Sequence, residues 1–126
     1  MRMKFAITAA LAAVAVGMAP ITSADAGIAL SPMSQQNAVR KAQTYLNLSA
    51  FSRQGLIEQL EYDDFSTEDA TFAVDHITVD WNEQAVKKAK TYLNLSAFSR
   101  AGLIDQLEYD GFTPAQATYG VAGTGL

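Results

Sequence analysis

The sequence predicts an all-α protein made of two tandem, three-helix repeats of the helix-turn-helix type. A stretch of about forty residues occurs twice at an offset of about 47 residues, and apolar side chains recur at helical spacing within each copy. The first copy reads AVRKAQTYLNLSAFSRQGLIEQLEYDDF at residues 38–65, and the second reads AVKKAKTYLNLSAFSRAGLIDQLEYDGF at 85–112. An active site needs dissimilar groups that converge, so a duplicated surface favours a binding module over an enzyme.

The first 26 residues have the features of a secretory signal peptide. Arg2 and Lys4 precede an apolar run at 5–19, and small residues at 24–26 place the expected cleavage before residue 27. The alternative is a short uncleaved anchor, although a run of about 15 residues falls below the roughly 20 needed to span a bilayer. We therefore expect an exported protein, secreted or located at the cell surface or envelope, with membrane contact only if this segment is retained.

The exported part is acidic and contains no cysteine. Without residues 1–26 the chain keeps 7 basic and 12 acidic residues, a net charge near −5. Such a protein is repelled by nucleic acid and anionic lipid headgroups, whereas a basic protein segment is attracted to it. Because no disulfide can form, stability must come from apolar packing and helix capping.

Residues 27–33 are expected to form a short, loosely ordered leader, followed by repeat 1 at 34–79 and repeat 2 at 80–126. In the first helix of each repeat an apolar stripe at helical spacing indicates a core-facing side. Its members are Ala38, Ala42, Tyr45 and Leu46 in the first copy and Ala85, Ala89, Tyr92 and Leu93 in the second.

The second helix of repeat 1 is expected to begin at Ser52, whose hydroxyl can cap a free amide, with Phe51 packing on Leu56 as a hydrophobic staple. The second copy repeats this arrangement. Gly55 and Gly102 lie inside the helix, where glycine costs about 1 kcal/mol relative to alanine. We therefore predict a close backbone contact at each glycine.

The turn after the second helix has Asp64 in one repeat and Gly111 in the other. Glycine adopts the left-handed conformation freely and aspartate tolerates it, which predicts a left-handed residue there. The third helix is expected to begin at Ser66 in repeat 1, and at Thr113 with Pro114 as first helical residue in repeat 2. Two helices joined by this tight turn give the helix-turn-helix layout.

Trp81 is the only tryptophan and follows Asp80, which is expected to cap the fourth helix. Its counterpart in repeat 1 is Ser34. We interpret the large ring as a wedge that fills the gap between the repeats. The alternative is an exposed ring that stacks on a ligand.

The strings SAFSRxGLIxQLEYxxF and DWNEQAxxKAxxYL, in this order, resemble the tandem domain of the Ltp family, the host cell surface-exposed lipoproteins of bacteria and temperate phages. The resemblance covers about residues 35–122. It implies a non-enzymatic protein of superinfection exclusion that binds an incoming phage's injection machinery, the tape-measure protein. Exclusion members carry a lipobox cysteine and spacer that this chain lacks. A secreted envelope module that contacts a host or cell-wall protein is therefore the alternative.

Charge argues against DNA binding, although the layout is helix-turn-helix. The second helix of repeat 1, the turn and the start of the third helix carry six acidic side chains against the single basic residue Arg53, and that surface would face phosphates. The acidic residues are Glu58, Glu61, Asp63, Asp64, Glu68 and Asp69. Their spacing lacks the alternating ligands and central glycine of an EF-hand, so we expect no metal and no cofactor.

His76 is the only histidine and has Gly123 as its counterpart, so a catalytic triad has one possible base and no support from the repeat. We interpret it as a residue at a helix end that interacts with the helix dipole. No catalytic residues are predicted, and we expect a monomer. The predicted contacts for a basic protein segment lie in the acidic turns and at the tryptophan: Glu61, Asp63, Asp64, Trp81, Glu108 and Asp110.

Overall fold

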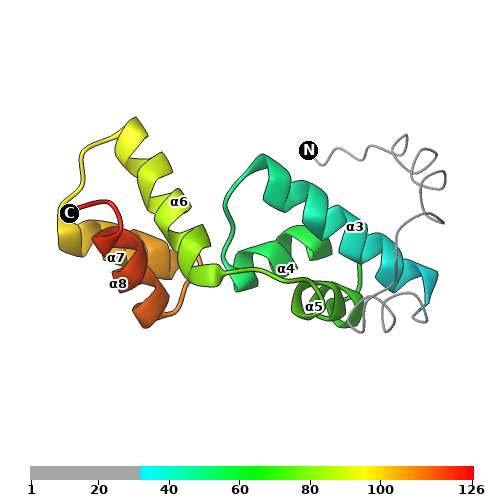
Figure 1. Ribbon diagram of the computed structural model, residues 1–126. Coiled ribbons are helices and arrows are strands. Elements are labelled where there is room, and N and C mark those ends of the chain that lie inside the picture. Colours follow the sequence, from blue (N-terminus) through cyan, green and yellow to red (C-terminus); the bar gives the residue numbers. More distant parts are fainter. Residues whose placement is uncertain (1–31) are drawn as a thin grey trace.

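The computed structural model describes residues 32–126, and the expected signal peptide with most of the leader lies outside these residues. The described part is all-α, as predicted (Figure 1). Its helices are α3 (Met33–Leu48), α4 (Arg53–Tyr62), α5 (Thr67–Asp75), α6 (Trp81–Leu95), α7 (Arg100–Tyr109) and α8 (Pro114–Ala122). Helix α3 begins at Met33, one residue earlier than predicted for the first repeat. In residues 32–126 we find no helix with the length and apolarity needed to span a bilayer.

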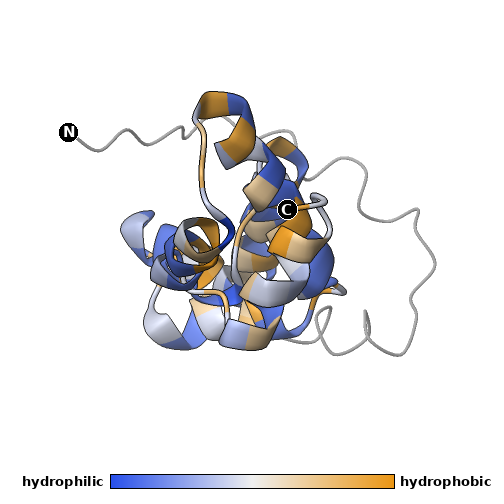
Figure 2. Cartoon of the chain, turned by 90° about the vertical axis from the view of Figure 1, so that its left-hand side faces the viewer, coloured by the Kyte–Doolittle hydropathy of each residue, from blue (hydrophilic) through white to orange (hydrophobic). Residues whose placement is uncertain are grey.

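The helices form two units of three, α3–α5 and α6–α8, which lie next to each other and are joined by residues 76–80 (Figure 1). In each unit the first helix packs mainly on the third, and the second helix contacts both. Apolar and polar residues are interspersed along each helix, as in amphipathic helices (Figure 2). Two tandem three-helix repeats are therefore observed, as the sequence predicts.

Each repeat has its own hydrophobic core. The fully buried leucines are Leu56 and Leu60 in the first core and Leu103 and Leu107 in the second. Small residues from the first and third helices pack around them, which lets these helices approach closely. In the apolar stripe predicted for the first helix of each repeat, the two alanines are 0 % exposed. The tyrosine and the leucine at the end of the stripe are only partly buried.

Side-chain caps fix the helix starts where the sequence predicts them. The hydroxyl or carboxylate of the N-cap residue accepts a hydrogen bond from the third amide of its helix in five cases: Ser52, Ser66, Asp80, Ser99 and Thr113. Thr113 forms a full capping box with Gln116, and Pro114 is the first helical residue. Each such cap is worth about 1 kcal/mol.

The turn after the second helix has the predicted left-handed residue in both repeats. The φ angle is 72° at Asp64 and 102° at Gly111. The predicted backbone contact is found at Gly55, where a Cβ atom would lie 3.5 Å from the carbonyl oxygen of Asp110, but not at Gly102. The closest neighbour at both glycines is the Oγ atom of the N-cap serine of the same helix, 2.9 Å from the added Cβ atom.

Gly120 brings α8 unusually close to α6. A Cβ atom there would lie 2.7 Å from the carbonyl carbon, the oxygen and the Cβ atom of Ala85. The corresponding residue of α5 is Ala73, which is fully buried with its methyl group present. The two repeats therefore differ in the space between their first and third helices.

Candidate functional site

Two of the predicted contact residues, Asp63 and Asp110, tie each turn to the first helix of its own repeat. The hydroxyl of Tyr45 donates a hydrogen bond to Oδ2 of Asp63, and the hydroxyl of Tyr92 donates to Oδ2 of Asp110 at 2.5 Å. Both aspartates also end the second helix as C-caps. Reversing either charge would therefore disturb the fold as well as the surface.

These contacts raise the pKa of both tyrosines to about 12. Partial burial of the ring is the largest cause, followed by the hydrogen bond to the aspartate and its negative charge. Because the folded-state pKa exceeds the ordinary value of 10.0, the neutral phenols contribute stability below pH 10. That contribution is lost as the pH rises from 10 to about 12.

An alkaline titration tests this arrangement. We expect phenolate absorbance of the native protein to include a component near pH 12, which a Tyr45→Phe, Tyr92→Phe double variant lacks. In Asp63→Asn the charge is removed while an acceptor remains, so the pKa of Tyr45 should fall. A double variant that still titrates near pH 12 would contradict the assignment.

The equal separation of each pair could have identified these contacts from sequence. Tyr45 and Asp63 are 18 residues apart, as are Tyr92 and Asp110. Two pairs of hydrogen-bonding side chains kept at one spacing in a duplicated unit indicate a contact within each unit. A search for helical periodicity does not detect such a pair, because its members lie on different helices.

Two of the other three predicted acidic residues are more accessible than Asp63 and Asp110. Asp64 and Glu108 are exposed, and Glu61 is half-buried and accepts a hydrogen bond from the hydroxyl of Thr67 at 2.5 Å. Glu61, Asp63 and Asp64 lie at the end of α4, whereas Glu108 and Asp110 lie at the end of α7. The predicted residues therefore form two separate turns, one in each repeat.

A cleft of about 360 Å³ lies between the repeats and contains Asp110. Repeat 1 lines it with the segment before α4, the first turn of α4 and Glu58, and repeat 2 with Lys88, Tyr109 and Asp110. Glu58, Lys88 and Asp110 place charges of both signs around the opening. Tyr109 is 86 % exposed, so the cleft is open to solvent and has an aromatic ring at its edge.

Two direct hydrogen bonds hold the repeats together. The backbone N–H of Phe51 donates to Oε1 of Gln84 at 2.9 Å, and the hydroxyl of Ser52 donates to the carbonyl oxygen of Asp110 at 2.6 Å. Sequence reasoning missed Gln84, although it is buried and has the shorter Asn37 as its counterpart in repeat 1. Such departures from the repeat indicate positions where the two units have different neighbours.

Trp81, the first residue of α6, is half-buried and packs against the core of repeat 1. The ring thus crosses from repeat 2 to repeat 1, which agrees with the interpretation as a wedge. A role of Trp81 in binding a ligand stays a prediction.

Acidic residues are unevenly divided between the repeats. Residues 33–79 hold three basic and seven acidic side chains, a net charge of −4, whereas residues 80–126 hold four basic and five acidic ones, a net charge of −1. In repeat 1 one acid is neutralised, because Arg53 forms a bidentate salt bridge to Asp75 with both N···O distances 2.8 Å. The remaining excess makes repeat 1 the more attractive surface for a basic partner.

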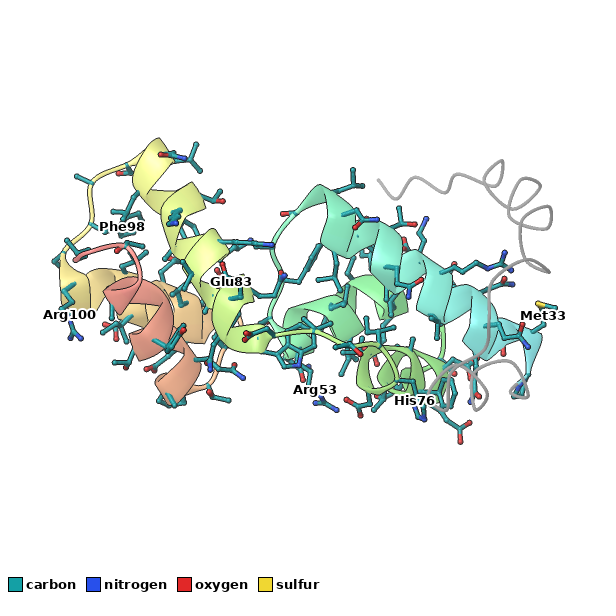
Figure 3. All side chains as sticks on the ribbon, in the orientation of Figure 1. Met33, Arg53, His76, Glu83, Phe98 and Arg100 are labelled. Carbon is teal, nitrogen blue, oxygen red and sulfur yellow. The ribbon has the colours of Figure 1, made fainter. Side chains whose placement is uncertain are left out.

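No metal site assembles among residues 32–126. No three histidine, cysteine or acidic side chains there are grouped to hold a metal ion. His76, labelled in Figure 3, is the C-cap of α5. Its Nδ1 atom lies 2.8 Å from the carbonyl oxygen of Phe72, and its ring is stacked on that phenyl ring with the ring centroids 3.9 Å apart. This is the position at a helix end that the sequence predicts.

Comparisons with known proteins agree with the duplicated architecture. The family model described as host cell surface-exposed lipoprotein matches residues 33–77 and again residues 80–123. The solved structure of Ltp, a superinfection exclusion protein from the Streptococcus thermophilus temperate phage TP-J34, is similar with a TM-score of 0.68 and 35 % sequence identity. The similarity covers 73 % of this chain and 96 % of that chain. No curated protein matches the sequence.

Proposed function

Because this chain belongs to the family of host cell surface-exposed lipoproteins, we propose that it is an exported, non-enzymatic binding protein that prevents an incoming phage from injecting its DNA. The observation that carries the proposal is the similarity of both repeats together to a superinfection exclusion protein at 35 % identity. Because 73 % of this chain is more than either repeat, the likeness spans both repeats and their junction.

The partner we propose is a basic segment of the phage's injection apparatus, the tape-measure protein. The excess of acidic residues in repeat 1 supports this, since opposite charge speeds association and excludes acidic competitors. Glu58 and Asp64 are exposed in repeat 1. Glu58 and Glu61 lie in α4, and Asp64 follows the end of that helix. Repeat 2 contributes the exposed Glu108 and the rim of the cleft.

The 126 residues contain no cysteine to carry the lipid that the family's description implies. A lipid tether raises the effective concentration of a binding module at the membrane. If the protein acts without such a tether, resistance to phage should depend steeply on the amount of protein produced, which a titration of expression against plating efficiency measures.

An infection assay on cells that produce the protein tests the proposal, with phage adsorption and DNA entry scored separately. We expect normal adsorption and failed entry. If entry is unchanged across a panel of phages, the exclusion role is wrong, and an envelope module with a host or cell-wall partner becomes the better proposal. A pull-down from envelope extracts would then identify its partner.

Matched charge reversals locate the contact. Glu58→Lys with Glu61→Lys changes repeat 1, and Asp105→Lys with Glu108→Lys makes the same change at the corresponding positions of repeat 2. We expect the first pair to abolish protection and the second to weaken it, since repeat 1 has the larger acidic excess. If neither pair matters, the contact lies elsewhere.

A further inference from the structure

An unbroken segment of ten residues is identical in the two repeats, but the end of this segment has different surroundings in each copy. The segment TYLNLSAFSR occupies residues 44–53 and 91–100. In the first copy Ala50 and Ser52 are buried, with 7 % and 2 % of their surface exposed, whereas Ala97 and Ser99 in the second copy are exposed. The same surface is therefore covered in repeat 1 and open in repeat 2.

Repeat 2 is what covers the first copy. Its turn after α7 places the carbonyl oxygen of Asp110 against the hydroxyl of Ser52, and Gln84 accepts the N–H of Phe51. Gly111 fits closely, because a Cβ atom there would lie 2.7 Å from Oγ of Ser52. The start of α4 thus binds the end of another helix, where a glycine in the left-handed conformation exposes the last carbonyl groups.

The second copy of the segment has the same serine hydroxyl and phenylalanine N–H, but no helix end in the described part of the chain is bound to them. The hydroxyl of Ser99 accepts the N–H of Gly102 at 2.9 Å but has no acceptor for its own proton among residues 32–126, and the N–H of Phe98 has no acceptor there either. Phe98 and Arg100 lie at the end of the molecule farthest from repeat 1 (Figure 3). Repeat 1 therefore leaves this surface accessible.

Arg100 gives the exposed copy a positive charge, whereas the charge of its counterpart in the covered copy is neutralised by an ion pair. Arg53 is paired with Asp75, but the residue that corresponds to Asp75 in repeat 2 is Ala122, and Arg100 has no ion-pair partner among the described residues. A guanidinium without a partner beside the start of a helix attracts the negative end of another helix.

We propose that residues 97–102, the segment before α7 with its first turn, bind the C-terminal turn of a helix in a partner protein, where a glycine in the left-handed conformation exposes a carbonyl oxygen. The contact would reproduce the one that the turn after α7 makes with the start of α4. The proposal rests on the proposed function only in identifying the partner as a phage injection protein.

A second copy of this chain does not fit as the occupant. Its repeat 2 turn is already covered, and its repeat 1 turn has Asp64, whose Cβ atom occupies the space that must stay empty. The residue in place of Gln84 is Asn37, which is shorter by one methylene and accepts a hydrogen bond from Arg40 at 3.0 Å. These two differences keep the chain from assembling end to end.

Removing these two differences tests whether the exposed surface at residues 97–102 binds such a turn. In the full chain, Asn37→Gln with Asp64→Gly gives repeat 1 the turn of repeat 2. We expect its mean mass in light scattering to rise with concentration, while the unaltered chain stays monomeric. Adding Ala97→Arg, at an exposed position, should restore the monomer, whereas Ala115→Arg on the exposed side of α8 should not. A double variant that stays monomeric would overturn the proposal.

The same blocking substitution tests the occupant in cells. We expect Ala97→Arg alone to reduce phage resistance about tenfold or more, with an unchanged circular dichroism spectrum. Full resistance of Ala97→Arg would overturn the assignment to the phage protein. If the unaltered chain gives no resistance, the proposed function fails, but the assembly experiment still decides whether the surface binds a helix end.

Discussion

Leu60→Ala is expected to unfold repeat 1 and leave repeat 2 folded. Leu60 is fully buried in the first core, and truncating a buried leucine costs about 2–5 kcal/mol. A unit of this size buries little apolar surface, so a loss of that magnitude is a large part of its stability. Because the cores are separate and few contacts cross the junction, the damage should stay in one repeat.

Hydrogen exchange measured repeat by repeat decides the outcome, since local unfolding exposes only the amides of the unit that opens. Leu107→Ala, the corresponding change in repeat 2, should give the mirror result. Leu48→Ala and Leu95→Ala are matched controls at positions that are 76 % exposed, and both should leave protection unchanged. Equal loss of protection in both repeats after Leu60→Ala would show that they unfold as one unit.

Gly120→Ala is expected to lower the stability of repeat 2, although alanine favours a helix by about 1 kcal/mol over glycine. The added methyl group would meet the backbone of Ala85 at 2.7 Å, and backbone atoms cannot rotate away. Overpacking of this kind costs typically 1–3 kcal/mol, which exceeds the gain in helix propensity. The net effect is a separation of α6 and α8 with loss of core packing.

Thermal unfolding checks this result. A loss of 1 kcal/mol lowers the Tm of a domain of this size by roughly 4–8 °C. Thr118→Ala, on the exposed side of α8, is the control and should change the Tm little. An unchanged or higher Tm for Gly120→Ala would mean that α8 shifts without cost, contrary to the packing described.

Local rules allowed most of the fold to be predicted from sequence. The caps at Ser52 and Thr113 depend on neighbours three residues away, and the left-handed turn depends on the single choice between Asp64 and Gly111. The core leucines follow from helical spacing. Each of these features is determined within a few residues, so a single sequence contains the information.

Contacts between distant residues were the part that sequence reasoning missed. The identical residues Ala50 and Ala97 have different exposure, which no local rule can predict. Asp63 and Asp110 were predicted only as binding residues because their tyrosine partners lie on another helix. The candidate site therefore became apparent only in the structure. It was found by comparing the segment of repeat 1 that is covered at the junction with the identical segment that is exposed in repeat 2.

The missing methyl group at Gly120 also affects which helices find each other during folding. Neighbouring units of near-identical sequence are prone to exchange helices and become trapped in misassembled states. If α5 replaced α8 beside α6, the methyl of Ala73 would collide with the backbone of Ala85, and if α8 replaced α5 beside α3, a void would remain. One small asymmetry thus disfavours both exchanged pairings, so we expect the chain to refold without a long-lived misassembled population.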